Sequence, residues 1–343
     1  MSGSSDDECA NLPSAQECEE RCQAFASVTG TDTALAMFYL QDRDWNVERA
    51  LNAYFEESGA SQSNAVGLDE NDITGENETT EEDKEPFRIR LMSWNIDGLD
   101  LKNLQSRTEG VCDTINKEEP HVVFLQELIP DAERIIEQRC PLYNIIPAGS
   151  EGYYVAMMLK SGPLVRVEET RILPYPNTMM TRNLLAVKCT VKGEKFCMMT
   201  SHLESTKDYA KARKEQLKKC FTHMSKVEND RTVLFGGDLN LRDKEVQEIG
   251  GIPEGIYDVW DITGQRKEAK FTWDTLRNDN LEFGQFKPRC RFDRIYIQHS
   301  VPKVVKPEYF ELVGIERLTS CHRFPSDHWA LLTHINILSK VPK

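Results

Sequence analysis

The sequence lacks the cysteine and histidine spacings that hold zinc or build a disulfide framework. Its ten cysteines are scattered without a CxxC pair, and its seven histidines form no HExxH motif. A zinc peptidase would need more closely spaced histidines, and a disulfide-rich secreted domain would need a regular cysteine pattern. Reduced thiols in a cytosolic or nuclear protein fit this usage better.

The chain also lacks a long apolar run and an apolar, basic beginning. No stretch approaches the roughly 20 apolar residues that a membrane-spanning helix needs. The first ten residues, MSGSSDDECA, are polar and acidic. We therefore expect neither a membrane span nor a signal peptide.

Basic side chains are scarce in the first quarter of the chain. Residues 1–86 hold 21 Asp and Glu but only 4 Lys and Arg, whereas the rest is nearly balanced, in a chain of net charge −14. The N-terminal quarter should repel polyanions, and the remainder can tolerate one.

The N-terminal quarter is predicted to hold one small helical unit. Residues 1–15 are expected to be a disordered tail, and residues 16–57 to form three short helices. Apolar positions follow helical spacing from Cys18 to Ala26, Thr31 is expected to cap the second helix, and Asn46 the third. The stretch VTGTDTALAMFYLQDRDWNVERALNAYFE resembles the ubiquitin-associated (UBA-like) domain. The resemblance implies that ubiquitin or ubiquitylated proteins bind this unit, with a structural spacer as the alternative.

Composition changes abruptly at Pro86. Residues 58–86 are mostly Ser, Asn, Gly, Glu and Asp, which predicts an acidic flexible linker. Residues 87–343 alternate short apolar runs with helical patterns, the clearest within 209–227. Many strands mixed with helices over about 255 residues predict one α/β domain.

Polar side chains end several of these apolar runs. The run from Thr232 to Phe235 is followed by two glycines and then by Asp238 and Asn240, which share one face of an extended segment. Other polar residues at strand ends are Asn95, Glu127, His202, Asp293, Asp327 and His328. Singly, each could form a turn or cap a helix. Burying carboxylates together is costly, however, so their recurrence predicts a metal or a charged ligand.

The residue types fit metal-assisted hydrolysis of a phosphodiester. Mg²⁺ prefers oxygen ligands and retains waters beside one or two carboxylates. Glu127 suits the role of metal ligand, with Asn95 nearby.

The other polar residues can act on water and phosphate. Asp238 can orient and deprotonate a water that Asn240 positions, and His328 can stabilise charge on a phosphate oxygen. Either Asp293 or Asp327 can fix the orientation of the imidazole. The set predicts attack of water on a phosphodiester.

Six ordered motifs resemble the endonuclease/exonuclease/phosphatase superfamily over residues 87–338: WN-x-DG, QE, SHLES, GD-x-N, DR and SDH. WNIDGL, SHLES, TWDT and RFPSDHW resemble most closely its 5′-tyrosyl-DNA phosphodiesterases. The resemblance implies a four-layered α/β sandwich, in which two mixed β-sheets are flanked by helices. It also implies hydrolysis that depends on Mg²⁺, with Mn²⁺ able to substitute. The implied substrate is the 5′-phosphotyrosyl bond between DNA and a trapped topoisomerase II tyrosine, and a 5′-phosphate remains.

The resemblance also assigns residues. The implied catalytic set is Asn95, Glu127, Asp238 and His328, with Asn240, Asp293 and Asp327 beside them. The implied contacts with the DNA 5′ end are Asn95, Ile96, Asp97, Gly98, Leu99, His202, Leu203, Glu204, Ser205, Thr206, Lys207, Asn240, Leu241, Arg242 and His328. Trp273 is expected to form an apolar wall near the terminal nucleotides, although a core aromatic is equally compatible with its sequence context.

Two alternatives stay open. Sister enzymes on this fold cleave abasic DNA or RNA, because substrate choice depends on loops. A ubiquitin-binding scaffold with an inactive nuclease-like domain is the other, and the intact set of polar residues argues against it. Phenol, with a pKa near 10, leaves more easily than a sugar alkoxide, so a site without an obvious general acid suits a tyrosyl ester. We expect a monomer that works in the nucleus and also occurs in the cytoplasm.

Overall fold

The computed structural model describes residues 15–41, 45–47, 49–51, 54, 86–281, 284 and 287–338. The chain divides into two compact units, Met1–Glu85 and Pro86–Lys343. Of the expected N-terminal tail only Ala15 is described, as the first residue of a helix, and of the expected linker only Pro86. The rest of both segments lies outside the described residues. Within the described part, no helix has the length and apolar character needed to cross a membrane.

The first unit begins with α1 (Ala15–Thr29) and α2 (Thr33–Gln41). Aromatic rings form its centre, where Phe25 stacks on Tyr39 with ring centroids 5.6 Å apart. The predicted cap at Thr31 is wrong. Asp32 Oδ1 accepts the backbone N–H of Leu35 at 2.8 Å instead, because Asp32 stands immediately before the first helical residue.

The predicted cap at Asn46 is confirmed. Its Oδ1 accepts the backbone N–H of Arg49 at 2.9 Å. The described residues that follow are helical and include Ala50, which is buried against the same apolar core. Three helical segments therefore share one small core, as the spacing of apolar residues predicts.

Two six-stranded sheets form the second unit. The first has the order β13 (Val305–Val313), β14 (Ala330–Ile337), β1 (Arg88–Asn95), β2 (Val122–Leu128), β4 (Tyr154–Lys160) and β3 (Tyr143–Pro147). The second has the order β5 (Val165–Pro174), β6 (Asn183–Val191), β7 (Glu194–Ser201), β8 (Thr232–Asp238), β12 (Asp293–Gln298) and β9 (Ile256–Asp258). Each sheet is mixed, because β1 runs parallel to β2 and β7 parallel to β8. A short ladder joins β10 (Trp273–Asp274) to β11 (Arg289–Cys290).

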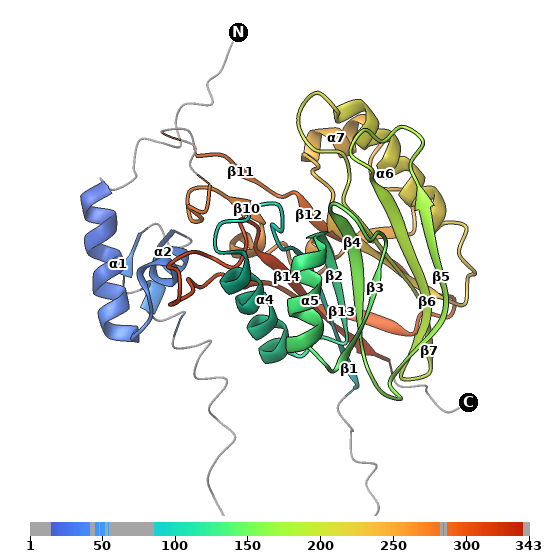
Figure 1. The fold of residues 1–343 in the computed structure, drawn as a ribbon, viewed down its shortest axis with the longest axis horizontal. Helices are drawn as coiled ribbons and strands as arrows, with labels where there is room; N and C mark the ends of the chain where they lie inside the picture. Colours follow the sequence, from blue (N-terminus) through green and yellow to red (C-terminus); the bar gives the residue numbers. More distant parts are fainter. Residues whose placement is uncertain are drawn as a thin grey trace, which may run out of the picture. The chain divides into compact units, whose positions relative to one another are not determined.

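Helices cover the outer face of each sheet, which makes four layers (Figure 1). The first sheet carries α4 (Leu104–Glu118) and α5 (Pro130–Arg139), and the second carries α6 (Ala210–Met224) and α7 (Asp243–Glu248). Met92 and Trp94 of β1 belong to the core beneath α4 and α5. Gln126 of β2 faces the other way, and its Nε2 donates to Thr200 Oγ1 of the second sheet at 3.2 Å. The expected four-layered α/β sandwich is confirmed.

The strand pairing gathers the polar strand ends at one rim of the sandwich. Asn95 is opposite Gln126 in the parallel β1–β2 pair, and Asp238 is opposite Asp293 in the antiparallel β8–β12 pair. Strand β14 runs antiparallel to β1, so His328, which precedes β14, lies near the C-terminal end of β1. Residues far apart in the sequence therefore meet at one place.

Removal of the first 83 residues should leave the expected hydrolase activity intact. The second unit has its own core and sheets, and the division falls at Pro86. We expect a chain starting at Lys84 to unfold cooperatively and to keep the kcat of the full chain within about twofold, since independent domains rarely share a core. Thermal denaturation and turnover of both chains measure this. A truncated chain that fails to fold would show that the N-terminal unit supports the second one.

Candidate active site

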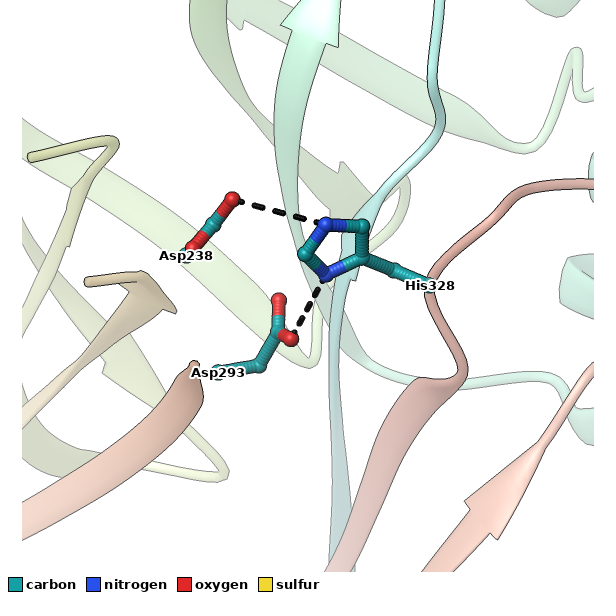
Figure 2. A group of neighbouring side chains, drawn as sticks. All are labelled: Asp238, Asp293 and His328. Atoms are coloured by element: carbon teal, nitrogen blue, oxygen red, sulfur yellow. Dashed lines mark hydrogen bonds and ion pairs between the residues drawn. The ribbon is translucent and has the colours of Figure 1, made fainter. Parts of the chain in front are cut away.

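Asp238, the last residue of β8, is the centre of the site. Its Oδ2 accepts Asn95 Nδ2 at 3.0 Å and lies 3.2 Å from His202 Nε2. His328 Nε2 is 3.7 Å from the same oxygen (Figure 2). The site therefore joins the two sheets, since Asn95 and His328 belong to the first sheet and its loops and Asp238 to the second.

Asp293 orients His328. Its Oδ2 lies 2.8 Å from His328 Nδ1, and Thr272 Oγ1 donates to that oxygen at 2.5 Å. Figure 2 shows one dashed line from each imidazole nitrogen, one to the carboxylate of Asp238 and the other to that of Asp293. The sequence left two candidates for this role, and the structure brings Asp293 to it. Asp327 instead accepts the indole N–H of Trp273 at 2.9 Å.

Charges in the site hold Asp238 ionised and His328 protonated. Burial alone would raise the pKa of Asp238, but the neighbouring His202 and His328 imidazoles hold it well below its usual range. Burial likewise disfavours protonated His328, yet the carboxylates of Asp293, Asp327 and Asp238 raise its pKa well above the usual value. A fixed carboxylate beside a fixed imidazolium can orient a water and stabilise a phosphoryl oxygen.

His202 is held between Asp238 and an arginine that the sequence reasoning missed. Arg182 Nη1 lies 2.8 Å from His202 Nδ1. A guanidinium only donates, so Nδ1 accepts and Nε2–H donates to Asp238. The Arg182 guanidinium also lies over the Tyr153 ring, 4.8 Å from its centroid. Arg182 stands immediately before β6, so polar residues at the beginnings of strands could have revealed it.

Glu127 reaches the rim through an irregular backbone. The β2–β4 ladder shifts register between Leu125 and Leu128, and Glu127 has a φ of 54°. Only small or specially held residues adopt that conformation at low cost. Gly98 packs directly on this segment, because a Cβ there would lie 2.1 Å from the Glu127 carbonyl oxygen. A side chain at position 98 would therefore displace Glu127.

Buried carboxylates crowd around Glu127. Burial raises the pKa of Glu127, and Asp327 and Asp238 raise it further, although His202 opposes them. Burial and the nearby Asp327 raise the pKa of Asp97 to about 8. These carboxylates are hard oxygen donors that repel one another when ionised. A divalent cation bound among them would favour their ionised forms, so the cluster fits such a cation.

Glu127 is therefore the residue that would hold a cation. Asn95 is turned elsewhere, because its Oδ1 accepts the Asp97 N–H at 3.0 Å while its Nδ2 binds Asp238. Asp238, Asp293 and His328 also offer ligand atoms within 4.8 Å of one another. His328 Nδ1 already contacts Asp293 Oδ2 at 2.8 Å, and Asp238 Oδ2 already accepts Asn95 Nδ2 at 3.0 Å.

Asn240 supports Asp238 through its backbone. Its N–H donates to Asp238 Oδ1 at 3.0 Å, and its side-chain Nδ2 contacts Leu203 O and Ser205 Oγ, both at 3.3 Å. Asn240 has a φ of 51°, which an Asx residue tolerates. The structure therefore brings Asn240 to Asp238 and the 203–205 loop.

The stretches expected to contact DNA are divided between core and surface. Ile96 belongs to the apolar core of the first sheet, and Leu203 and Leu241 to that of the second. The buried Glu204 carboxylate accepts the Thr178 hydroxyl at 2.6 Å and the Met179 N–H at 2.8 Å. These four side chains do not reach the surface and serve to hold the loops. Leu99, Thr206, Lys207 and Arg242 are exposed at the same rim.

Trp273 lies at the border between core and surface. It is half-buried, and its ring lies 5.4 Å from that of Phe292. Arg242 covers the same Phe292 ring, 5.4 Å from its centroid. An aromatic pair edged by a cation beside His328 can accept a nucleobase or a sugar face.

Comparisons with known proteins identify relatives of both units. A UBA-like domain model matches residues 19–61, and the endonuclease/exonuclease/phosphatase family model matches residues 92–328. The chain is 41% identical over 337 residues to tyrosyl-DNA phosphodiesterase 2 of Homo sapiens, covering 92% of each chain. It is 40% identical over 347 residues to the Bos taurus protein of the same name, covering 95% of this chain and 94% of that one.

Solved structures agree. A crystal structure of D. rerio TDP2 complexed with a single-strand DNA product is similar with a TM-score of 0.71 and 39% identity, covering 73% of this chain and 99% of that chain. A crystal structure of TDP2 from Caenorhabditis elegans is similar with a TM-score of 0.67 and 32% identity, covering 98% and 99%.

Proposed function

Because the chain belongs to the tyrosyl-DNA phosphodiesterase 2 family of the endonuclease/exonuclease/phosphatase superfamily, we propose that it hydrolyses the 5′-phosphotyrosyl bond of DNA that carries a tyrosyl adduct. Membership confirms the resemblance that the motifs indicated, and the chain is a phosphodiesterase hydrolase. The observation that carries the substrate proposal is the buried array of Asp238, His328 and Asp293, with the exposed Arg242 beside it.

The array acts on water and on the phosphoryl group. Asp238 accepts a hydrogen bond from the attacking water and takes its proton as the new P–O bond forms. Its low pKa makes it a weak base, so orientation of the water is its main contribution. His328 donates from Nε2 to a phosphoryl oxygen and stabilises the charge that develops there.

The leaving group departs on the side opposite the water. His328 Nε2 lies close to Asp238, hence on the side of the entering water in an in-line displacement. How readily the leaving group departs therefore depends on the acidity of its conjugate acid. The tyrosine phenol has a pKa near 10, so its phenolate leaves without protonation more readily than a sugar alkoxide.

A divalent cation supports this reaction. Enzymes of this family depend on a divalent metal, and the chain has the acidic cluster to hold one. We propose Mg²⁺, with Mn²⁺ able to substitute, because the donors are carboxylate oxygens, and Glu127 as its protein ligand. When bound, the cation neutralises phosphoryl charge. Chelation by EDTA should abolish turnover, and added Mg²⁺ should restore it.

Release of tyrosine from a 5′-phosphotyrosyl oligonucleotide tests the function. We expect the rate to rise with the acidity of the phenol when chemistry limits turnover, so a nitrophenyl ester of a 5′-phosphorylated nucleotide should be cleaved faster than the tyrosyl ester. An abasic duplex and unmodified internal phosphodiesters are the control substrates and should survive. Efficient nicking of either would favour a repair endonuclease instead.

Partners and location follow from the substrate. We propose that topoisomerase II–DNA complexes supply the adduct, since a trapped topoisomerase tyrosine stays joined to DNA through this bond. We also propose that the enzyme works as a monomer in the nucleus and in the cytoplasm. Similarity of residues 19–61 to UBA-like domains supports ubiquitin as a ligand of the first unit. Titration of the full chain with ubiquitin, and microscopy of the labelled protein, test these proposals.

A further inference from the structure

Arg107, in the first turns of α4, is a fully buried arginine outside the hydrogen-bonded array around Asp238. Its side chain is only 1% exposed. Burial of a guanidinium is costly unless its donors are all satisfied, and it has five N–H donors and no acceptor. All five find acceptors. These are Asp97 O at 2.9 Å, Asp97 Oδ2 at 3.2 Å, Lys102 O and Pro325 O at 3.1 Å each, and Asp100 O.

The acceptors belong to two separate loops of the site. Residues 96–103 connect β1 to α4 and begin directly after Asn95. Pro325 begins the segment that leads to His328. A second link joins the same loops, because Ser326 Oγ donates to Asn95 O at 2.6 Å and accepts the His328 N–H at 3.0 Å. Arg107 therefore ties together the backbone that carries Asn95 and the backbone that carries His328.

The 96–103 loop needs such a tie. Asp97 and Asn103 have φ values of 52° and 56°, in the left-handed region, which Asx residues tolerate but adopt only occasionally. Asn103 stands at the N-cap of α4 without a side-chain capping hydrogen bond. Strained backbone persists only where surrounding contacts fix it, and Arg107 contacts three carbonyl groups of this loop.

The loop also supports Glu127. Gly98 lies so close to the Glu127 carbonyl oxygen that a Cβ could not fit between them. A shift of the 97–98 backbone would move Glu127, whose left-handed φ gives it little freedom to adapt. The position of Arg107 thus bears on Asn95, on His328 and on Glu127.

We propose that Arg107 is a positioning residue for the phosphodiester reaction. Its guanidinium clamps the 96–103 loop to Pro325 and so fixes the positions of Asn95 and His328 next to Asp238. Through the same loop it also fixes the position of Glu127. The inference rests on the proposed function only for the choice of DNA substrate. It predicts that losing the clamp lowers turnover more than it lowers DNA binding, because Arg107 is buried beneath the loops and cannot touch DNA.

Two substitutions in the full chain test the proposal. Arg107→Gln removes the charge and most donors, and Arg107→Lys keeps the charge but cannot span five acceptors. Arg139→Gln is the matched control, since it breaks a half-exposed ion pair between Arg139 of α5 and Asp113 of α4, the helix that carries Arg107. Each variant is assayed for kcat and KM with a 5′-phosphotyrosyl oligonucleotide and a nitrophenyl ester. Mn²⁺ binding is measured by electron paramagnetic resonance, and folding by circular dichroism.

We expect Arg107→Gln to lower kcat about 100-fold with KM changed less than about threefold, because a misplacement near 1 Å has effects of that size. Arg107→Lys should lose about 10-fold, Mn²⁺ should bind both variants several-fold more weakly, and Arg139→Gln should match the parent. A folded variant with kcat within twofold of the parent, or with only KM raised, would overturn the proposal. So would unfolding of both variants, since Arg107 would then serve stability alone.

The two proposals can fail separately. If the parent cleaves the nitrophenyl ester but not the tyrosyl oligonucleotide, the substrate assignment is wrong, while the ester still measures Arg107. If the parent cleaves neither, the proposed function is wrong, and unchanged Mn²⁺ affinity in Arg107→Gln would overturn the clamp as well.

Discussion

Replacing Asp238 with asparagine is expected to lower kcat by roughly 10³-fold or more, and His328→Ala by a similar factor. Asparagine keeps the shape of Asp238 but removes the charge that faces Asn95, His202 and His328. Alanine at 328 removes the only imidazole that Asp293 orients. Binding of 5′-phosphotyrosyl DNA should change much less, because both side chains act mainly on the transition state. Single-turnover rates and equilibrium binding separate the two effects.

The double variant provides a sharper test. Asp238 and His328 act on one transition state, so the double variant should be little worse than the poorer single one. Asp230→Asn is the matched control, because Asp230 is an exposed aspartate just before β8 that pairs with Lys195. Losses that multiply in the double variant would mean that the two residues act in separate steps.

Glu127→Gln is expected to reduce activity to background and to weaken binding of Mg²⁺. Glutamine preserves the size of the side chain but replaces a charged ligand by a neutral one. Burial and the nearby Asp327 and Asp238 leave this carboxylate destabilised unless a cation accompanies it, so the substitution should not destabilise the fold. Calorimetric titration measures the binding of Mg²⁺, and a melting curve measures the stability of the fold.

Glu137→Gln is the control for this substitution. Glu137 is exposed on α5, which follows β2 directly. The Glu137→Gln variant should bind Mg²⁺ and turn over substrate as the parent does. Near-normal turnover of Glu127→Gln at saturating Mg²⁺ would show that the cation is held elsewhere in the acidic cluster.

The fold and the centre of the site were predictable because each depends on local pattern. Apolar runs of strand length mark the sheets, and polar residues at their ends mark the rim. Asp238 and His328 stand out in this way without knowledge of strand order. The pairing of Asp238 with Asp293 needs the register of β8 against β12, which no local pattern contains. The choice between Asp293 and Asp327 as the partner of His328 therefore stayed open.

Other features depend on contacts between distant segments. Arg182 and Tyr153 lie outside the recognised motifs, and only the packing of β4 against the start of β6 brings the guanidinium over the ring. The burial of Leu203 and Glu204 was missed because a contiguous motif does not reveal which of its side chains are covered by distant segments, such as Thr178 and Met179. Arg107 reads in the sequence as one more charged position of an amphipathic helix.

Strand order also has a consequence for synthesis of the protein. Strand β14 lies between β13 and β1 in the first sheet, yet it begins at Ala330, whereas β1 ends at Asn95. While the ribosome is still translating the intervening residues, one edge of β1 has no partner, and such an edge can pair with another nascent chain. His328 arrives with the same late segment. A nascent chain released before β14 would therefore be both aggregation-prone and inactive.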